Sequence, residues 1–299
     1  DAYGSWTFLE QLPVERYLEG VVPHEIGAGS PPAALQAQAV LARTWALANS
    51  HRFGLDGYHL CSDTQCQVYS DPRQASESVR EAIRATSGQV LQLDSQPIQA
   101  WYHATNGGVS AGAEEAWSMD PLPYVQARAD GSSDWVGSIT LPIQSAEDVR
   151  LLLNRWDGAF GAGHPRFRWN RLYTAGQLSR ALAAAGQGDA LPTALRAVSR
   201  GPSGRVLALE MDREGGAAPV TLRLDAIRRT LRRLPSTLFV IQPEGAGAWR
   251  FQGGGFGHGV GLSQAGAIDL AGRGWSAERI LDHYYPGTKL APLAPAPET

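Results

Sequence analysis

The stretch VVPHEIGAGSPPAALQAQAVLARTWAL, residues 21–47, joins a short apolar run to a long alanine-rich segment and places one carboxylate, Glu25, between them. The two valines are typical of the end of a buried strand that stops at Pro23. Ser30 can cap a helix, and the two prolines after it suit a first helical turn. These signals predict a helix over residues 31–53 that ends before Gly54.

This predicted helix has the features of a central element. Leu35, Ala39, Ala42 and Ala46 recur at helical spacing and therefore share one face. Alanine at so many of these positions lets another element approach the helix closely. We therefore expect the helix to pack at the centre of the fold.

The rest of the chain mixes helical and strand patterns. A helix is expected over 76–86, followed by a hairpin of QVLQL and PIQAWYHA joined across DSQ. Helical patterns with caps at Ser145 and Thr174 indicate a helical subdomain inserted over 136–190. Strand patterns return in RVLALEM, PVTLRL and STLFVIQP, and residues 291–299 read as a flexible tail.

These patterns predict an α+β fold, with the central helix packed on a mixed, mainly antiparallel sheet. The catalytic core is expected to comprise residues 1–135 and 191–290, interrupted by the inserted subdomain.

Composition narrows the classes of function. The 299 residues carry a formal net charge of −3, which disfavours a general nucleic-acid-binding protein. Apolar residues never run for the roughly 18 positions that a membrane helix requires. The first ten residues, DAYGSWTFLE, suggest a processed form whose signal or anchor is not in this sequence.

Glu25 admits two interpretations. It can be a surface carboxylate that caps the following helix. Alternatively, its position after an apolar run, between a proline and a glycine-rich turn, suits a carboxyl group held in a partly desolvated cleft. Desolvation raises the pKa of a carboxyl group, as a general acid near neutral pH requires.

The two cysteines leave three alternatives open. Cys61 and Cys66 can form a local disulfide, hold zinc together with His59, or act as thiols. Only His59 and His51 are near in sequence, so a full set of zinc ligands is not evident. A disulfide or inert thiols are therefore favoured over zinc.

A glycine-rich loop and several aromatic residues are further candidates. The segment GGGFGHGVGLSQAGA, residues 253–267, lacks both the Gly-Lys-Ser/Thr and the G-x-G-x-x-G signatures of nucleotide-binding loops. His258 is one of two large side chains in this loop. Aromatic faces pack well against pyranose rings, and the tyrosines near turn signals are Tyr102, Tyr124, Tyr284 and Tyr285.

Taken together, several separated blocks resemble the stage II sporulation protein D family (SpoIID/LytB). These blocks are VERYLEGVVPHEI, AALQAQAVLARTWAL, CQVYSD, YHATNGG, AEEAW, PYV, SGRV, LPSTLF, GGGFGHGVGLSQAGA and HYYPGT, and they span residues 14–288. Members of that family cut bacterial cell-wall glycan or are described as amidase enhancers.

The resemblance implies a lytic transglycosylase that acts on peptidoglycan glycan strands outside the cytoplasm, with Glu25 as its acid and base. By the same resemblance, the activity requires no cofactor, although some members of the family hold zinc through their cysteines. An amidase or another wall-remodelling protein is a possible partner. The residues that it implies in substrate binding are Arg43, Gln36, Tyr102, Tyr124, His258, Ser263, Gln264, Tyr284 and Tyr285.

The resemblance also has departures. Ile26, Gln36 and Ala265 stand where the family often has a methionine, a lysine and an aromatic residue, while the glutamate itself is kept. If the glycine loop lines the cleft that holds Glu25, we expect His258 to lie near Glu25 and to bind sugar or the acid. Loss of the lysine would weaken substrate contacts.

Overall fold

The structure, a computed structural model, describes residues 7–232 and 234–293 and confirms the α+β class with mainly antiparallel sheets. The chain forms two compact units. Unit 1 comprises Asp1–Trp101, Ala271–His283 and Gly287–Thr299, and unit 2 comprises Tyr102–Leu270 and Tyr284–Pro286. Each unit is described separately below.

Unit 1 begins with helix α1 (Val14–Val22), which continues into a π-helical turn, η1 (Pro23–Gly27). The predicted strand at Val21 and Val22 is therefore wrong. Leu18, Val21 and Val22 are spaced three and four residues apart, so they share one helix face, and all three are fully buried. A local apolar pair does not distinguish a strand end from a buried helix end.

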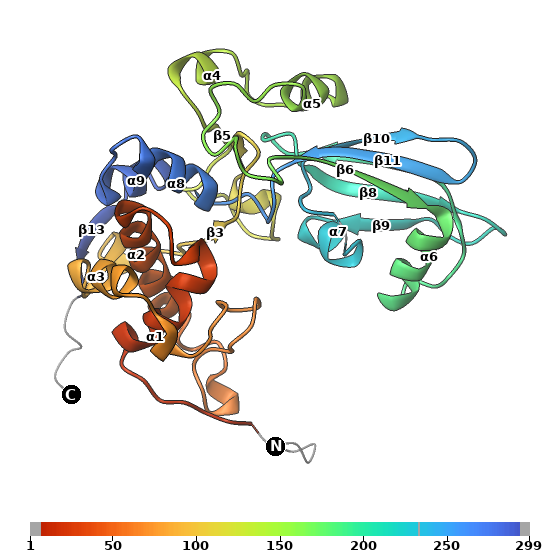
Figure 1. Cartoon of the computed structure of the whole chain (residues 1–299). Helices are drawn as coiled ribbons and strands as arrows, with labels where there is room; N and C mark the ends of the chain where they lie inside the picture. Colours follow the sequence, from red (N-terminus) through yellow and green to blue (C-terminus); the bar gives the residue numbers. More distant parts are fainter. Residues whose placement is uncertain (1–6, 233, 294–299) are drawn as a thin grey trace. The chain divides into compact units, whose positions relative to one another are not determined.

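The predicted central helix is α2 (Pro32–Ala48). It packs against α1 and against α3 (Glu77–Ala85), and Figure 1 shows these helices side by side. Its predicted face of Leu35 and three alanines is buried. Pro31, not Ser30, occupies the N-cap position, and the Ser30 hydroxyl donates to the Ile26 carbonyl at 2.8 Å. The helix ends at Ala48, and turns and the short 3-10 helix η2 (Gly54–Asp56) follow it.

A small antiparallel sheet completes unit 1, with strand order β13-β1-β2. The predicted hairpin is present in β1 (Gln89–Leu93) and β2 (Gln96–Pro97), but β2 stops at the proline. Strand β13 (Lys289–Pro292) pairs with β1, so the start of the predicted flexible tail is ordered by main-chain hydrogen bonds. Residues 294–299 of that tail lie outside the described residues. The remaining elements are η3 (Pro72–Gln74) and α9 (Ala277–Tyr284).

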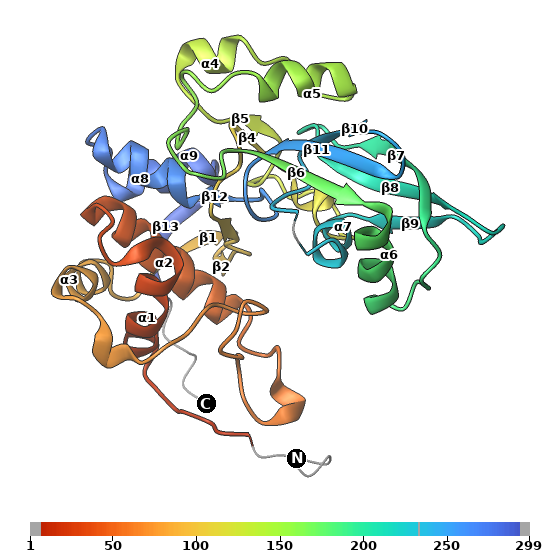
Figure 2. The same cartoon turned by 45° about the vertical axis from the view of Figure 1, so that its right-hand side comes forward.

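Unit 2 holds two three-stranded antiparallel sheets, visible in Figure 2. Their strands are β10 (Phe239–Pro243), β11 (Ala248–Gly254) and β6 (Arg168–Thr174) in one sheet, and β7 (Pro192–Arg200), β8 (Val206–Arg213) and β9 (Val220–Arg223) in the other. Side chains from both sheets share one hydrophobic core with helices α6 (Ala175–Ala184) and α7 (Asp225–Thr230).

Shorter elements of unit 2 bring distant segments together. Strand β3 (Tyr102–His103) pairs in parallel with β12 (Leu262–Ser263), and β4 (Val109–Ser110) pairs with β5 (Arg128–Ala129). Besides α6 and α7, the helices of unit 2 are η4 (Ala113–Glu115), α4 (Ser133–Gly137), α5 (Ala146–Leu153) and most of α8 (Gln264–Gly272).

The segment predicted as an inserted helical subdomain, 136–190, is not purely helical. It contains α5 and α6, whose predicted caps at Ser145 and Thr174 are confirmed by side-chain hydrogen bonds. It also contains β6, which pairs with β11 along its full length, so the segment is built into the sheets of unit 2. Among the described residues, no helix combines the length and the apolar character needed to cross a membrane.

Candidate active site

Glu25 lies in the π-helical turn η1, between Pro23 and Gly27. Single π-helical turns are rare and often occur at functional sites. Gly27 has a φ of 89°, a left-handed conformation that glycine adopts without strain and that ends the turn. Glu25 is half-buried.

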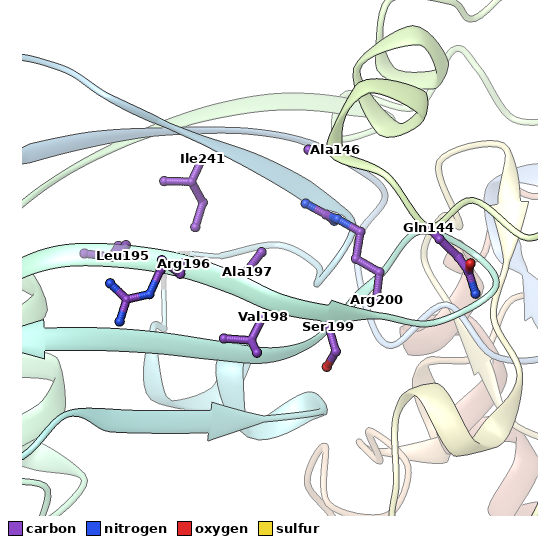
Figure 3. A pocket seen from close by; sticks show the side chains of 9 residues that line it. All are labelled: Gln144, Ala146, Leu195, Arg196, Ala197, Val198, Ser199, Arg200 and Ile241. Carbon is purple, nitrogen blue, oxygen red and sulfur yellow. The ribbon is translucent and has the colours of Figure 1, made fainter.

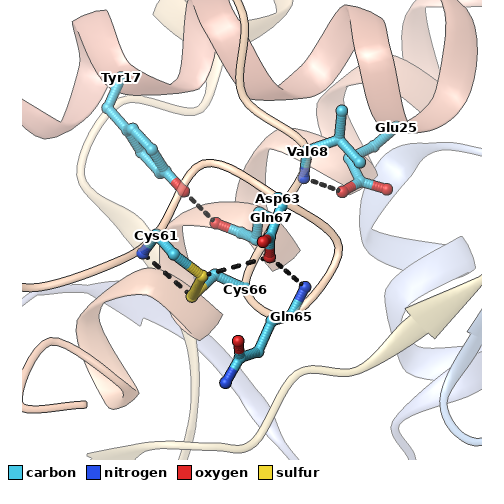
Figure 4. Close-up of a disulfide and its surroundings, with 8 residues drawn as sticks. All are labelled: Tyr17, Glu25, Cys61, Asp63, Gln65, Cys66, Gln67 and Val68. Carbon is cyan, nitrogen blue, oxygen red and sulfur yellow. Dashed lines mark hydrogen bonds between the residues drawn. A yellow bond between two sulfur atoms is a disulfide. The ribbon is translucent and has the colours of Figure 1, made fainter. Parts of the chain in front are cut away.

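A main-chain amide far along the chain holds the Glu25 carboxylate. The Val68 N–H donates to Glu25 Oε1 at 2.8 Å, as Figure 4 shows. A hydrogen bond from a backbone amide fixes the orientation of a carboxylate.

The residue before Val68 anchors the same strand of chain to two helices. Gln67 is almost fully buried, and its Oε1 accepts a hydrogen bond from the Tyr17 hydroxyl of α1 at 3.0 Å. Its Nε2 donates to the Ala42 carbonyl of α2 at 3.3 Å. The segment that carries Val68 is therefore held by both helices that flank the π-turn.

Tyr17 also feels the charge of Glu25. Burial, and secondarily the Glu25 carboxylate, raise the pKa of Tyr17 above its ordinary value. Its ring stacks on Tyr69, with ring centroids 5.4 Å apart. Gly20 permits this packing, because a Cβ there would collide with the Tyr69 ring and the Ser70 carbonyl. Tyr17 consequently remains a neutral hydroxyl within the electrostatic influence of Glu25.

The structure joins Cys61 and Cys66 in a disulfide, the first of the three alternatives (Figure 4). The Cys61 N–H donates to the Cys66 Sγ at 3.1 Å, and the Tyr69 N–H donates to the Ser62 carbonyl at 3.2 Å. The disulfide therefore closes the loop directly before Gln67 and Val68.

His59, the third tentative zinc ligand, is exposed. Within the part of the chain that the structure describes, no group of three or more His, Cys, Asp or Glu side chains is arranged to hold a metal ion. Because both sulfur atoms are bonded to one another, neither is available as a thiolate ligand in this state.

Arg43 contacts protein rather than solvent. Its side chain is fully buried, and its guanidinium donates to both carboxylate oxygens of Glu15, at 2.8 and 2.6 Å, and to the Gln89 carbonyl at 3.0 Å. This bidentate pair joins α1, α2 and β1. Arg43 thus has a structural role in this packing, and its expected contact with substrate stays a prediction. Gln36, about two turns before Arg43 on α2, is half-buried.

The glycine loop belongs to unit 2 and packs against the YHATNGG segment. A Cβ on Gly257 would lie 2.7 Å from the His103 Cβ, and one on Gly255 would lie 2.9 Å from the Thr105 carbonyl oxygen. At Gly259 a Cβ would collide with the guanidinium of the fully buried Arg205. The space beside these three glycines is filled by protein, so they permit close packing within unit 2.

His258 is half-buried in the same loop. Its Nδ1 accepts a hydrogen bond from the Val260 N–H at 3.1 Å, and its ring lies 4.9 Å from Trp117 and 5.3 Å from His103, between ring centroids. Burial lowers the pKa of His258 to about 4, and the Asp225 carboxylate offsets this only in part. Glu25 and His258 lie in different units, so their proximity stays a prediction.

Several residues expected to bind substrate have structural contacts in unit 2. The Tyr285 hydroxyl accepts from the Leu262 N–H at 3.1 Å, the Tyr284 hydroxyl donates to Asp130 at 3.0 Å, and the Ser263 hydroxyl accepts from the Gly266 N–H at 3.2 Å. All three side chains are buried, as are Tyr124 and Gln264, so their expected role in contacting a glycan is not supported; Tyr102 is half-buried. A tyrosine near a turn signal can equally be a core residue whose hydroxyl satisfies the backbone.

The surroundings of Glu25 also include residues that sequence reasoning missed. The sequence patterns do not indicate Tyr17 or Gln67 as site residues, although both lie in blocks that carry the family resemblance, VERYLEGVVPHEI and CQVYSD. Tyr17 is eight residues before Glu25. A prediction of α1 as a helix would have placed Tyr17 about two turns from Glu25. Nothing in the local pattern indicates the bond from Val68.

Comparisons with known proteins agree with this assignment of blocks. A family model described as "Stage II sporulation protein" matches residues 2–93, which include Glu25 and the disulfide. A second model, described as "Domain of unknown function (DUF8618)", matches residues 111–261 in unit 2.

Three curated relatives cover most of the chain. The amidase enhancer of Bacillus subtilis (strain 168) is 30% identical over 295 residues, covering 91% of this chain and 40% of the relative. Stage II sporulation protein D of Bacillus subtilis (strain 168) is 26% identical, over 95% of this chain and 76% of the relative. The same protein from Bacillus amyloliquefaciens is 29% identical, over 95% and 75%.

The chain thus spans 40% of the length of the amidase enhancer and about three quarters of the two sporulation proteins. These matches show that residues 2–93 form a stage II sporulation protein domain, and that the chain is similar over most of its length to stage II sporulation protein D and to the amidase enhancer.

Proposed function

We propose that this protein is a peptidoglycan lytic transglycosylase that acts outside the cytoplasm, with Glu25 as its single acid and base. The observation that carries the proposal is the hydrogen bond from the Val68 amide to Glu25, on a π-helical turn within the segment that matches the sporulation family. A carboxylate fixed by its neighbours costs little reorganisation when it reacts.

The proposed reaction cleaves the bond between N-acetylmuramic acid and N-acetylglucosamine. Glu25 first protonates the glycosidic oxygen as this bond breaks. The resulting carboxylate then takes the proton from the 6-hydroxyl of the muramic acid, whose oxygen attacks the anomeric carbon and closes a 1,6-anhydro ring. The substrate supplies its own nucleophile, so the second carboxylate that hydrolytic glycosidases use is not required.

The test is the substitution Glu25→Gln, assayed on purified glycan strands with and without stem peptides. The amide keeps the size of the side chain but carries no titratable proton, so we expect 1,6-anhydromuramyl products to fall by about 10² to 10⁴. Exposed Glu244→Gln is the control for any effect of lost charge. Residual activity within a few-fold of the unsubstituted protein rules out Glu25 as the acid.

A second candidate function is supported by the relative named amidase enhancer, which aligns with 91% of this chain. In that case the chain binds the cell wall and recruits or activates an amidase without cutting glycan. Mass spectrometry distinguishes the two: anhydromuramyl ends from the chain alone support the transglycosylase. Free stem peptides that appear only when an amidase is added support the enhancer.

A further inference from the structure

A groove in unit 2 is separate from every residue discussed above. It has a volume of about 510 Å³, within the range of small-ligand sites. It is lined by β7, by β10 and by the segment before α5, and Figure 3 shows Ala197 and Ile241 pointing toward one another from opposite sides. The lining residues used below are Gln144, Leu195, Ala197, Arg200 and Ile241.

The two strands that border the groove each have an edge without a strand partner. In the described part of the chain, β7 pairs only with β8, and β10 pairs only with β11. Such an edge carries a row of N–H and C=O groups that an extended chain can satisfy. A ligand lying between two edges of this kind can pair with one or both of them.

The groove is closed at one end. There, the Arg200 Nη1 donates to the Phe239 carbonyl at 2.9 Å, and the Val206 N–H donates to the Thr237 carbonyl at 2.9 Å. Away from that end, Leu195, Ala197 and Ile241 are partly buried and pack against the core between the two sheets. These three side chains give the groove apolar contacts beside the polar Arg196 and Ser199, and the closed end is polar.

Arg200 places a positive charge at the closed end. Its guanidinium donates to two carbonyls, those of Phe239 and Gly204, and no carboxylate among residues 7–232 and 234–293 forms an ion pair with it. Burial, and secondarily the Arg150 charge, lower the pKa of Arg200 to about 10, so it remains protonated at neutral pH. Arg150 is itself paired with Glu147 at 3.3 Å.

The neighbouring Arg196 provides a direct contrast. It lies on the same strand, but its guanidinium is held by Asp212, at 2.7 Å from Nη2 to Oδ1, and by Glu210. Both arginines line the groove, but Arg196 is exposed and has carboxylate partners on β8, whereas Arg200 is half-buried and donates only to carbonyls.

We propose that this groove binds an extended, acidic segment of a partner protein. The segment adds as a strand to the free edges of β7 and β10, places apolar side chains against Leu195, Ala197 and Ile241, and lets an Asp or Glu carboxylate accept hydrogen bonds from Arg200 near Gln144. The proposal does not depend on catalysis by Glu25.

The test begins with a phage-displayed library of random seven-residue peptides, selected on the full chain. We expect the enriched sequences to alternate apolar residues and to contain Asp or Glu. The affinity of the enriched peptides is then measured by fluorescence anisotropy. Arg200→Gln should weaken binding by about tenfold or more, since hydrogen bonds to charged groups are worth about 1.5 to 3 kcal/mol. Arg196→Gln, the matched control, should change it by less than about twofold, in line with an exposed ion pair.

Hydrogen exchange of the unsubstituted protein gives a second measurement that needs no variant. A bound peptide should slow exchange of amides in residues 192–200 and 239–243, and N-methylation of alternate peptide amides should abolish binding because it removes strand donors. The proposal is overturned if no peptide is enriched, if enriched peptides lack acidic residues, if both arginine variants bind equally well, or if protection appears elsewhere.

Discussion

At the scale of single residues, the folded chain keeps His258 uncharged. Its pKa falls from an ordinary value of 6.5 to about 4, chiefly because burial disfavours the imidazolium ion. In the unfolded chain, the same histidine gains a proton as the pH falls through about 6.5. The unfolded state then binds more protons than the folded state, so the free energy of unfolding decreases as the pH is lowered from about 6.5 toward 4.

His258→Asn should therefore make stability less dependent on pH. Asparagine can accept the Val260 N–H through its Oδ1, as the imidazole Nδ1 does, but it does not titrate. We expect the slope of unfolding free energy against pH, between pH 5 and 6, to fall by up to about 1.4 kcal/mol per pH unit. Urea unfolding at several pH values measures this slope.

The control for this prediction is His59→Asn, because His59 is exposed. The buried His103, whose pKa burial also lowers well below its ordinary value, is kept in all three proteins and contributes equally to each. Equal slopes for the unsubstituted protein and for His258→Asn would contradict the assignment of a neutral buried histidine.

At the scale of elements, the disulfide loop connects a covalent bond to the orientation of the Glu25 carboxylate. Cys61 and Cys66 close a loop that is followed at once by Gln67, held between α1 and α2, and by Val68, whose amide holds Glu25. The position of Glu25 thus depends on its own turn and on a second segment that lies 43 residues later in the chain.

Reduction of this disulfide should destabilise the protein by about 2 kcal/mol, the chain-entropy expectation for so short a loop. We also expect cleavage to decrease, if Glu25 is the acid, because Val68 is held less firmly. Urea midpoints with and without reductant measure the first effect. The double variant Cys61→Ser, Cys66→Ser is the control and should not respond to reductant. Two free thiols in the unfolded, unreduced protein would contradict the pairing.

At the scale of the whole molecule, unit 1 is assembled from the two ends of the chain. Strand β13 pairs with β1 from Gln89↔Pro292 to Gln92↔Lys289, and the Leu293 N–H donates to the Gly88 carbonyl at 2.8 Å. Helix α9 also belongs to this unit. About two hundred residues separate the paired strands, as the Gln92–Pro292 hydrogen bond across 200 residues illustrates.

A truncation that removes residues 288–299 should therefore loosen unit 1. Amides of β1 that bond to β13 lose their acceptors, and we expect their hydrogen exchange to accelerate by about tenfold or more, the equivalent of about 1.4 kcal/mol. Exchange in β8 and β11 of unit 2 provides an internal reference. Truncation after Leu293, which keeps β13 entire, is the matched control. Unchanged exchange at Val90, which lies opposite Ala291 of β13, would refute the prediction; Leu91, whose amide donates to the Thr44 hydroxyl instead, is not a reporter of this pairing.

Local sequence determined the features that depend on neighbouring residues. Helix α2 and its buried face, the caps of α5 and α6 and the hairpin turn after β1 follow from side chains that bond or pack within a few residues of themselves. For the same reason, the motif that frames Glu25 was identifiable: a proline, a carboxylate and a glycine stand within five residues. The family resemblance was identifiable because its blocks are short and ordered along the chain.

Tertiary structure decided what these side chains contact. An apolar pair at residues 21–22 proved helical because α1 buries one face, and Arg43 proved structural because Glu15 lies 28 residues away on a packed helix. Tyr285, Ser263 and the loop glycines fill space within unit 2. The physical reason is common to all of them: a buried polar group must find a partner, and across tens or hundreds of residues only the path of the folded chain determines which partner is near.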